Sequence, residues 1–355
     1  MPERLLVVGP AWVGDMVMSQ SLLISLAKRH PGLQLDVLAP GWSLPLLQRM
    51  PQVDQAIEMP LGHGEFGFLQ RRRLGHALRG RGYTQAIVLP RSLKSALVPF
   101  FAGVPRRTGY RGEMRFGLLN DIRVLDQGRL TQTVQRYVSL GLPADGPQPP
   151  AVPEPRLGVD PDNQQRLVEV LSLDTKRPIV AMMPGAEYGP AKCWPLDNFA
   201  KLARSLIERG YRVWILGSER DNEAGQAIAT QASDDPSRVR QSGADARNLC
   251  GQTTLTDAVD LLAMARWAVS NDSGLMHVAA AVGCHVIAIY GSSTPDYTPP
   301  LSARSTVHYL RLDCSPCFER TCPLGHLQCL REISAEAVLA TFDRVQDMTR
   351  GQVNV

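Results

Sequence analysis

The sequence predicts an α/β protein made of two doubly wound domains, each a parallel sheet wrapped by helices, that face one another across a cleft. Short apolar runs alternate with amphipathic helical patterns along the chain, which is typical of parallel sheets. This alternation is interrupted once, by the proline-rich stretch 142–155, which reads as an interdomain linker. The chain has 355 residues and 44% hydrophobic content, enough to build two cores.

Apolar runs locate the strands of the first half. The runs LLVV, LDVL and AIVL predict strands at 5–8, 35–38 and 86–89. The amphipathic segment 16–29 predicts a helix between the first two of them. We place the first domain at 1–150.

The same alternation resumes after the linker. It predicts strands at 179–183, 213–216, 267–270 and 286–290, and helices at 197–208, 223–231, 255–265 and 274–282. A last helix is expected at 334–349. The second domain then spans 151–333, and a C-terminal helix and tail fills 334–355. Whether that tail packs back toward the first domain stays open.

Composition excludes a membrane-spanning chain and favours a cytoplasmic one. No apolar run approaches the roughly 18 to 20 residues that cross a bilayer, and the N-terminus lacks the pattern of a signal peptide. The net charge of +4 is mild, yet basic residues concentrate in the first third of the chain. We therefore expect an acidic partner on that side, and no nucleic acid.

The stretch WAVSNDSGLMHVAAAVG reads as a buried strand that ends in a polar turn and opens a helix. The N–H groups of Ser273, Gly274 and Leu275 would lack intrahelical acceptors at the positive end of the helix dipole, which suits phosphate. Asp272 or Ser273 acting only as a helix cap is the alternative. His277 lies one turn further on the same face, where it either donates to phosphate or braces the loop.

A second anion site is expected in PGAEYGPAKCWP, after the strand at 179–183. Lys192 stands at the end of this loop, just before a helix, and Ala186 and Glu187 lie earlier in it. A lysine and a helix N-terminus at the carboxyl ends of two strands can hold a diphosphate from two sides. A solvated surface lysine is the plainer alternative, but the two sites together favour a diphosphate ligand.

The loop after the first strand, in VVGPAWVGDMVMSQSL, turns through Gly14 and puts Asp15 near a helix start. Asp15 either complements the helix dipole, a contribution of about 0.3–1 kcal/mol, or is a carboxylate that takes a proton from an attacking hydroxyl. The spacing of the glycines is not the G-x-G-x-x-G of a dinucleotide site, so a Rossmann dehydrogenase is disfavoured.

The chain has seven cysteines, and four of them crowd into LDCSPCFERTCPLGHLQCL with His326 among them. This set could hold a structural metal, but its second half lacks the paired spacing of zinc sites. Free thiols or a redox-sensitive loop are therefore favoured, and a structural metal stays open. The four are Cys314, Cys317, Cys322 and Cys329.

Five blocks in order, GPAWVGDMVMSQSL, MPLGHGEF, KSALVPFFAGVPRRTGYRGEMRFGLLND, PGAEYGPAKCWP and SNDSGLMHVAAA, resemble the bacterial ADP-heptose:lipopolysaccharide heptosyltransferases. The resemblance implies a GT-B fold, with the acceptor lipid core on the N-terminal domain and the ADP-heptose donor on the C-terminal one. It implies transfer, with inversion, of L-glycero-D-manno-heptose onto the first heptose of a heptosyl-Kdo2-lipid A acceptor, at the cytoplasmic face of the inner membrane. Action at another core position, a related epimerase, or a non-catalytic nucleotide-sugar-binding protein are the alternatives.

The resemblance also implies roles for matched residues. Asp15 matches the catalytic aspartate, and Lys192 with the helix start at Ser273 would stabilise the departing diphosphate, so no cofactor is expected beyond the donor. Asp272 would orient heptose hydroxyls or cap the helix. The ribose hydroxyls would be read by an acid in the loop GSERDNE, which contains Gly217, Ser218, Glu219 and Asp221, with Asp221 the better match. Acceptor phosphates and carboxylates would meet basic side chains, namely Lys94, Arg106, Arg107, Arg111 and Arg115.

Overall fold

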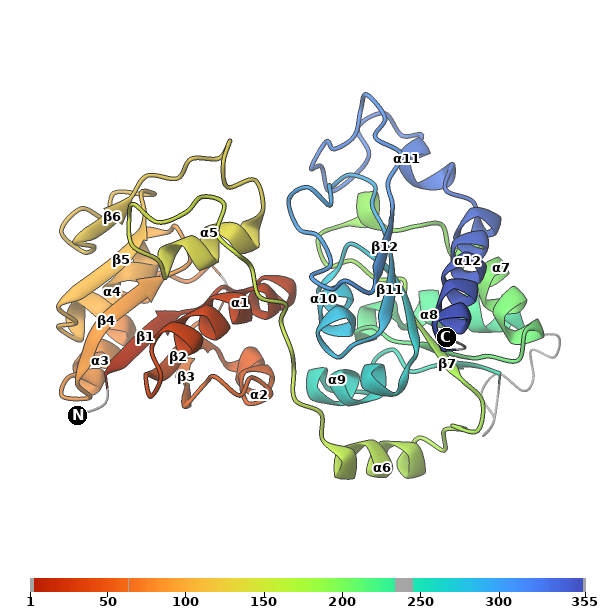
Figure 1. Cartoon of the computed structure of the whole chain (residues 1–355), viewed down its shortest axis with the longest axis horizontal. Coiled ribbons are helices and arrows are strands. Elements are labelled where there is room, and N and C mark those ends of the chain that lie inside the picture. Colours follow the sequence, from red (N-terminus) through yellow and green to blue (C-terminus); the bar gives the residue numbers. More distant parts are fainter. Residues whose placement is uncertain (1–2, 63, 234–244, 354–355) are drawn as a thin grey trace. The chain divides into compact units, whose positions relative to one another are not determined.

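The computed structural model describes residues 3–62, 64–233 and 245–353, with side chains up to 348. The chain divides into two compact units, 1–158 and 159–355 (Figure 1). Each unit is a parallel six-stranded sheet with helices packed against it, so the predicted α/β class with two doubly wound sheets is confirmed.

The first unit contains sheet β3-β2-β1-β4-β5-β6. The chain builds strands outward from β1 to β3, returns, and adds β4 on the other side of β1. This reversal puts the loops after β1 and β4 side by side at the carboxyl edge of the sheet, where ligands bind in doubly wound folds. The strands are β1 Arg4–Val8, β2 Gln34–Pro40, β3 Gln55–Met59, β4 Tyr83–Val88, β5 Arg106–Tyr110 and β6 Asp121–Arg123. The helices are α1 Val13–Arg29, α2 Leu44–Leu47, α3 Phe68–Leu78, α4 Leu97–Phe101 and α5 Thr133–Leu140, with 3-10 turns η1 Gly41–Ser43 and η2 Leu93–Ala96.

The second unit repeats this plan with sheet β12-β11-β10-β7-β8-β9. Its order reverses between β7 and β10, so the loops after these two strands are neighbours. The strands are β7 Ile179–Met183, β8 Arg212–Ile215, β9 Ala246–Asn248, β10 Trp267–Asn271, β11 His285–Ile289 and β12 Ser305–His308. The helices are α6 Pro161–Val170, α7 Leu196–Glu208, α8 Asn222–Ala232, α9 Leu255–Met264, α10 Gly274–Ala281, α11 Gln328–Arg331 and α12 Ala335–Val353, with 3-10 turns η3 Pro190–Lys192 and η4 Glu219–Asp221.

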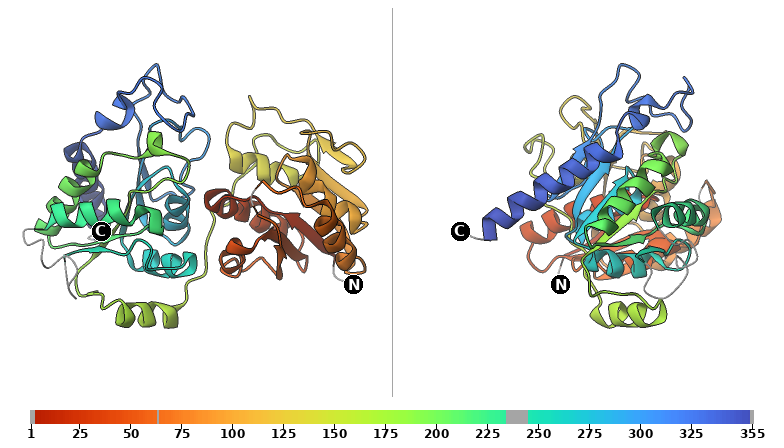
Figure 2. Two further views of the ribbon diagram at one scale, coloured as in Figure 1. Left: turned by 180° about the vertical axis from the view of Figure 1, so that it is seen from behind. Right: turned by 90° about the vertical axis from the view of Figure 1, so that its right-hand side faces the viewer.

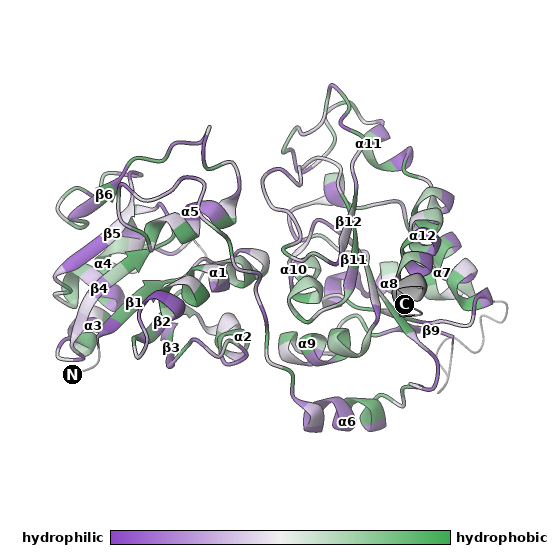
Figure 3. Ribbon diagram, viewed as in Figure 1, coloured by the Kyte–Doolittle hydropathy of each residue, from purple (hydrophilic) through white to green (hydrophobic). Residues whose placement is uncertain are grey.

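Hydropathy along the sheets follows their burial. Strands such as β1 and β11 are green in Figure 3, and nearly all of their residues are buried. Such fully buried strands read as continuous apolar runs, which is why the sequence located them. In contrast β5 and β6 carry arginines and appear purple, so their pattern gave no strand signal.

The core of the second unit lies between its sheet and the helices α7, α8 and α12. Trp194 and Trp267 are fully buried there, and Phe342 of α12 packs against Trp267 in a tilted arrangement with ring centroids 4.3 Å apart. Helix α12 runs beside α7, as the side view in Figure 2 shows. The last helix therefore belongs to the core of this unit.

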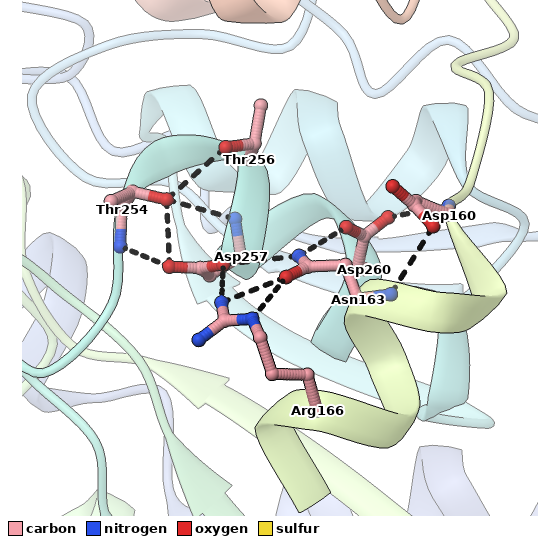
Figure 4. A network of polar contacts seen from close by, with 7 residues as sticks. All are labelled: Asp160, Asn163, Arg166, Thr254, Thr256, Asp257 and Asp260. Carbon is pink, nitrogen blue, oxygen red and sulfur yellow. Dashed lines mark hydrogen bonds and ion pairs between the residues drawn. The ribbon is translucent and has the colours of Figure 1, made fainter. Parts of the chain in front are cut away.

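A polar network fastens α6 to α9 where the chain enters the second unit (Figure 4). Asn163 Nδ2 donates to Asp257 Oδ1 at 3.0 Å and to Asp260 Oδ2 at 2.7 Å. The backbone N–H of Asp160 donates to Asp260 Oδ1 at 2.9 Å, and Arg166 pairs with Asp257. Asp260 is fully buried, so these donors replace the water it loses.

Candidate functional site

Three loops follow neighbouring strands at the carboxyl edge of the second sheet. They come after β10, β7 and β8, in that spatial order, and they carry the predicted Asp272, Lys192 and Asp221 respectively. Because the sheet order reverses between β10 and β7, the first two loops flank the expected ligand position of this fold.

Lys192 and Asp272 form the centre of the candidate site. Lys192 Nζ lies 2.5 Å from Asp272 Oδ2, and Ser293 Oγ donates to the same oxygen at 2.6 Å. The side chains of Lys192 and Asp272 are 17% and 5% exposed. The ammonium also lies 5.1 Å from the centre of the Tyr188 ring, a cation–π contact. Lys192 is therefore a positioned, largely buried cation rather than a solvated surface lysine.

Asn271 fixes the two loops to one another. Its Oδ1 accepts from the backbone N–H of Trp194 at 2.9 Å, and its Nδ2 donates to the carbonyl of Pro184 at 2.5 Å. Asn271 is fully buried. The sequence analysis assigned no role to Asn271 or Ser293. For Asn271 a signal existed, because the polar run Ser270–Asn271–Asp272 ends a buried strand.

Helix α10 begins as predicted, with Ser273 as its N-cap residue. No side chain caps this start, and Asp272 bonds to Lys192 and Ser293 instead. The N-terminal N–H groups are thus not occupied by a cap side chain, and the positive end of the helix dipole adds to the charge of Lys192. A compact group of positive charge and N–H donors of this kind suits an anion with several oxygens.

His277 lies inside the unit beneath this helix start. It is 5% exposed, and its Nδ1 has no hydrogen-bond partner among the described residues. Burial lowers the pKa of His277 to about 4, against an opposing effect of Asp272. His277 is therefore a buried, uncharged group at pH 7.

In the loop after β8, the carboxylate of Asp221 forms hydrogen bonds within the loop itself. Asp221 Oδ2 accepts from both the backbone N–H and the hydroxyl of Ser218, each at 2.8 Å. This carboxylate also packs against Gly185 and Gly217, where a Cβ atom would lie 2.2 and 2.8 Å from it. Glu219, two residues earlier in the same 3-10 turn, is exposed. In the loop after β7, Glu187 forms an exposed ion pair with Arg220, and Ala186 accepts the backbone N–H of Gly189.

Asp15 lies in the first turn of α1, directly after the loop that follows β1. The sequence predicted this position, and Gly14 is buried beside it. The loop is tight, because a Cβ on Gly9 would lie 2.9 Å from the methyl carbon of Met16. The carboxylate thus stands at the carboxyl edge of the first sheet, at the reversal between β1 and β4.

The predicted basic residues of the first unit occupy different environments. Lys94 is half-buried, Arg106 and Arg111 are exposed, and Arg106 pairs with Asp121 at 2.9 Å. Arg107 donates to the carbonyls of Leu118 and Val104, and is half-buried.

Arg115 was expected to contact the acceptor at the protein surface, but its side chain is buried. It is 2% exposed and donates to the carbonyls of Pro90 and Ser92. Burial, together with the charge of Arg91, lowers its pKa to about 10. Arg115 therefore supports the loop after β4 from inside.

The seven cysteines are all free thiols in the described part of the chain. Within that part, no three histidine, cysteine or acidic side chains are already arranged as a metal site. None of the described helices combines the length and apolar character needed to cross a membrane.

Comparison with known proteins identifies the family. The sequence profile of Glycosyltransferase family 9 (heptosyltransferase) matches residues 71–328. The chain belongs to this family. It is 47% identical over 343 residues to lipopolysaccharide heptosyltransferase 2 of Escherichia coli K12, covering 95% of this chain and 96% of that protein. It is 47% identical over 311 residues to lipooligosaccharide heptosyltransferase 2 of Haemophilus influenzae, covering 86% and 88%.

Solved structures agree with this glycosyltransferase assignment. The structure of Escherichia coli ADP-heptose lipopolysaccharide heptosyltransferase II matches with a TM-score of 0.78 and 44% identity, covering 96% of this chain and 99% of that one. A family 9 glycosyltransferase of Veillonella parvula matches with a TM-score of 0.81 at 18% identity, which shows the shared fold. The predicted GT-B class and the glycosyltransferase activity are thereby confirmed.

Proposed function

We propose that this glycosyltransferase moves L-glycero-D-manno-heptose from ADP-heptose onto the first heptose of the lipopolysaccharide inner core, inverting the anomeric carbon. The observation that carries the proposal is the buried Lys192–Asp272 pair beside the uncapped start of α10, at the strand-order reversal of the second sheet. The names of the relatives supply the donor and acceptor classes.

In this proposal Lys192 and α10 hold the donor diphosphate. An ammonium carries three N–H donors, and Asp272 uses one of them, so phosphate oxygens can accept from the others. Negative charge grows on the diphosphate as the bond to the sugar breaks. Fixed positive groups therefore stabilise the transition state more than the bound donor, which raises turnover. Asp272 positions Lys192 and has its second oxygen to orient heptose hydroxyls.

The nucleoside is assigned to the loop after β8. An oxygen of the Asp221 carboxylate already accepts two hydrogen bonds from Ser218, so we assign to Asp221 the role of fixing the turn. We assign binding of the ribose hydroxyls to the exposed Glu219. An acid at this point of a doubly wound fold accepts both ribose hydroxyls. This assignment reverses the order of preference that the sequence favoured.

Asp15 is assigned as the general base. Inversion in a single displacement needs the acceptor hydroxyl to attack the anomeric carbon while ADP departs from the other side. The hydroxyl proton passes to the Asp15 carboxylate, the new C–O bond forms, and the bond to the β-phosphate breaks with its electron pair leaving on ADP. The first unit thus supplies the proton acceptor and the second unit the charge that receives the leaving group.

The acceptor surface is assigned to the first unit. The exposed Arg106 and Arg111, together with Lys94, suit the phosphates and carboxylates of a lipid A and Kdo core. Met114 and Phe116 lie in the same segment and are 82% and 69% exposed. Apolar side chains among arginines suit the surface of an anionic membrane, so we propose peripheral contact with the cytoplasmic face of the inner membrane.

The experiment is mass analysis of the product from purified protein, ADP-heptose and a mono-heptosylated Kdo2-lipid A acceptor. The proposal expects a product heavier by one heptose, together with released ADP. Release of ADP without acceptor modification, or binding of the donor without turnover, would assign the chain to donor hydrolysis or to non-catalytic binding.

A further inference from the structure

Four cysteine side chains in the second unit surround one small cavity. Cys314, Cys317 and Cys322 lie in the irregular segment after β12, and Cys329 lies in α11. All four line a cavity of about 20 Å³. A cavity needs roughly 10–15 Å³ to hold one water molecule, so this one has room for a single atom-sized guest.

The lining offers thiolates no positive partner. Besides the cysteines, its described residues include one titratable group, His326, and neither lysine nor arginine. His326 Nδ1 accepts the backbone N–H of Gln328 at 3.0 Å, which fixes the ring in its own turn. A divalent cation would engage all four.

We propose that Cys314, Cys317, Cys322 and Cys329 together bind one zinc ion as a structural tetrathiolate site. Zinc takes four thiolate ligands in tetrahedral geometry, and each thiol gives its proton to solvent as its bond to the metal forms. The four sulfurs are not already gathered as a metal site in the described chain. Binding therefore requires the four sulfurs, which already line one cavity, to move closer together, and three of the four are only half-buried on an irregular segment. The proposal departs from the sequence-based preference for free thiols.

The site would brace the loops that carry the candidate donor residues. The backbone N–H of Ala191 donates to the carbonyl of Arg320 at 3.0 Å, and that of Phe318 donates to Ser292 at 2.7 Å. Ala191 precedes Lys192, and Ser292 precedes Ser293. At Gly189 the contact is so close that a Cβ would lie 2.5 Å from the Arg320 carbonyl oxygen. A metal that orders the cysteine segment would thus hold Lys192 in place. Only the importance of this effect for donor binding rests on the proposed function; the metal site itself does not.

The first test is metal content after purification without chelator from zinc-supplemented cells. We expect about one zinc per chain in the unaltered protein and a loss of most of it in Cys314→Ser and Cys322→Ser. Cys284→Ser is the matched control. Its thiol lies outside the cluster and donates to the carbonyl of Leu262, a bond that serine can keep. Zinc near zero in the unaltered protein, or full zinc in both cluster variants, would overturn the proposal.

A second measurement keeps the proposal testable if a cluster variant fails to fold. The unaltered protein, stripped by chelator and dialysed, is titrated with Cd²⁺, and the ultraviolet thiolate-to-metal absorption is followed together with the melting temperature. We expect the absorption to saturate at one Cd²⁺ per chain with a rise in melting temperature. Absence of the band contradicts the site. A saturating band without ADP binding would preserve the metal site while contradicting the proposed donor site.

Discussion

Lys192 is held from two sides, by the carboxylate of Asp272 and by the ring of Tyr188. These contacts fix the position of its ammonium group, which distinguishes a ligand-binding lysine from a solvated one. Burial of the pair also makes each partner depend on the other, because an unpaired charge in this position would be costly.

Changing Lys192 to alanine should weaken ADP binding and lower turnover together. The loss in kcat/KM should correspond to roughly 2–4 kcal/mol if Lys192 behaves as a lost oxyanion donor. Lys201→Ala, an exposed lysine on α7, is the matched control and should leave both quantities unchanged. Near-normal turnover of Lys192→Ala would remove the residue from the site.

His277 should make the protein less stable in mild acid. Its pKa is about 4 in the folded chain, with burial as the main cause, against about 6.5 when exposed. The unfolded chain therefore binds more protons between these values, and stability falls as pH drops from 6.5 to 4, by up to roughly 3 kcal/mol.

Denaturant unfolding at several pH values checks this prediction. His277→Gln, which cannot titrate, should show a flatter pH profile in that window than the unaltered protein. An unchanged slope would mean that other groups cause the acid sensitivity.

Helix α6 shows how an element can be positioned by a few polar contacts. Its Asn163 bridges two aspartates of α9, of which Asp260 is fully buried (Figure 4). Asn163→Ala removes one hydrogen-bond donor from the buried Asp260 carboxylate and one from Asp257, so the free energy of unfolding should fall by about 1–3 kcal/mol. Gln165→Ala removes an exposed contact of the same helix and should change it by less than about 0.5 kcal/mol. Equal effects of the two variants in denaturant unfolding would contradict the role of Asn163.

Element prediction succeeded where burial alone shaped the sequence. β1, β7 and β10 are apolar runs that end in polar turns, and the sequence located all three. It missed β3 and β5, because partly exposed strands keep polar residues and lose the continuous apolar run.

The candidate site could likewise be predicted only in part from the sequence. Lys192, Asp15 and the α10 start follow from strand ends. The contacts of Asp272 with Ser293 and of Asn271 with Pro184 join residues far apart in sequence, and no local pattern encodes them. The burial of Arg115 was missed for the same reason, since its partners Pro90 and Ser92 lie 25 and 23 residues before it in the chain.

At the scale of the whole molecule, the two units repeat one plan with different contents. Each sheet reverses its strand order once and presents loops at that point. In the first unit the reversal carries a carboxylate, Asp15, and in the second it carries a cation and a helix start. The proposed reaction needs both, a proton acceptor for the nucleophile and positive charge for the leaving group. The central claim is this division of labour.

The measurement that tests it most directly is turnover and ADP affinity of Asp15→Asn, with the melting temperature taken on the same sample. Asparagine keeps the size of the side chain but cannot accept the proton. We predict that turnover falls by about 10²–10⁴ while the Kd for ADP, set in the other unit, changes by less than about twofold. If Asp15 only complements the dipole of α1, the variant loses about 0.3–1 kcal/mol of stability and keeps its activity. A folded, fully active Asp15→Asn would contradict the division of labour between the two units.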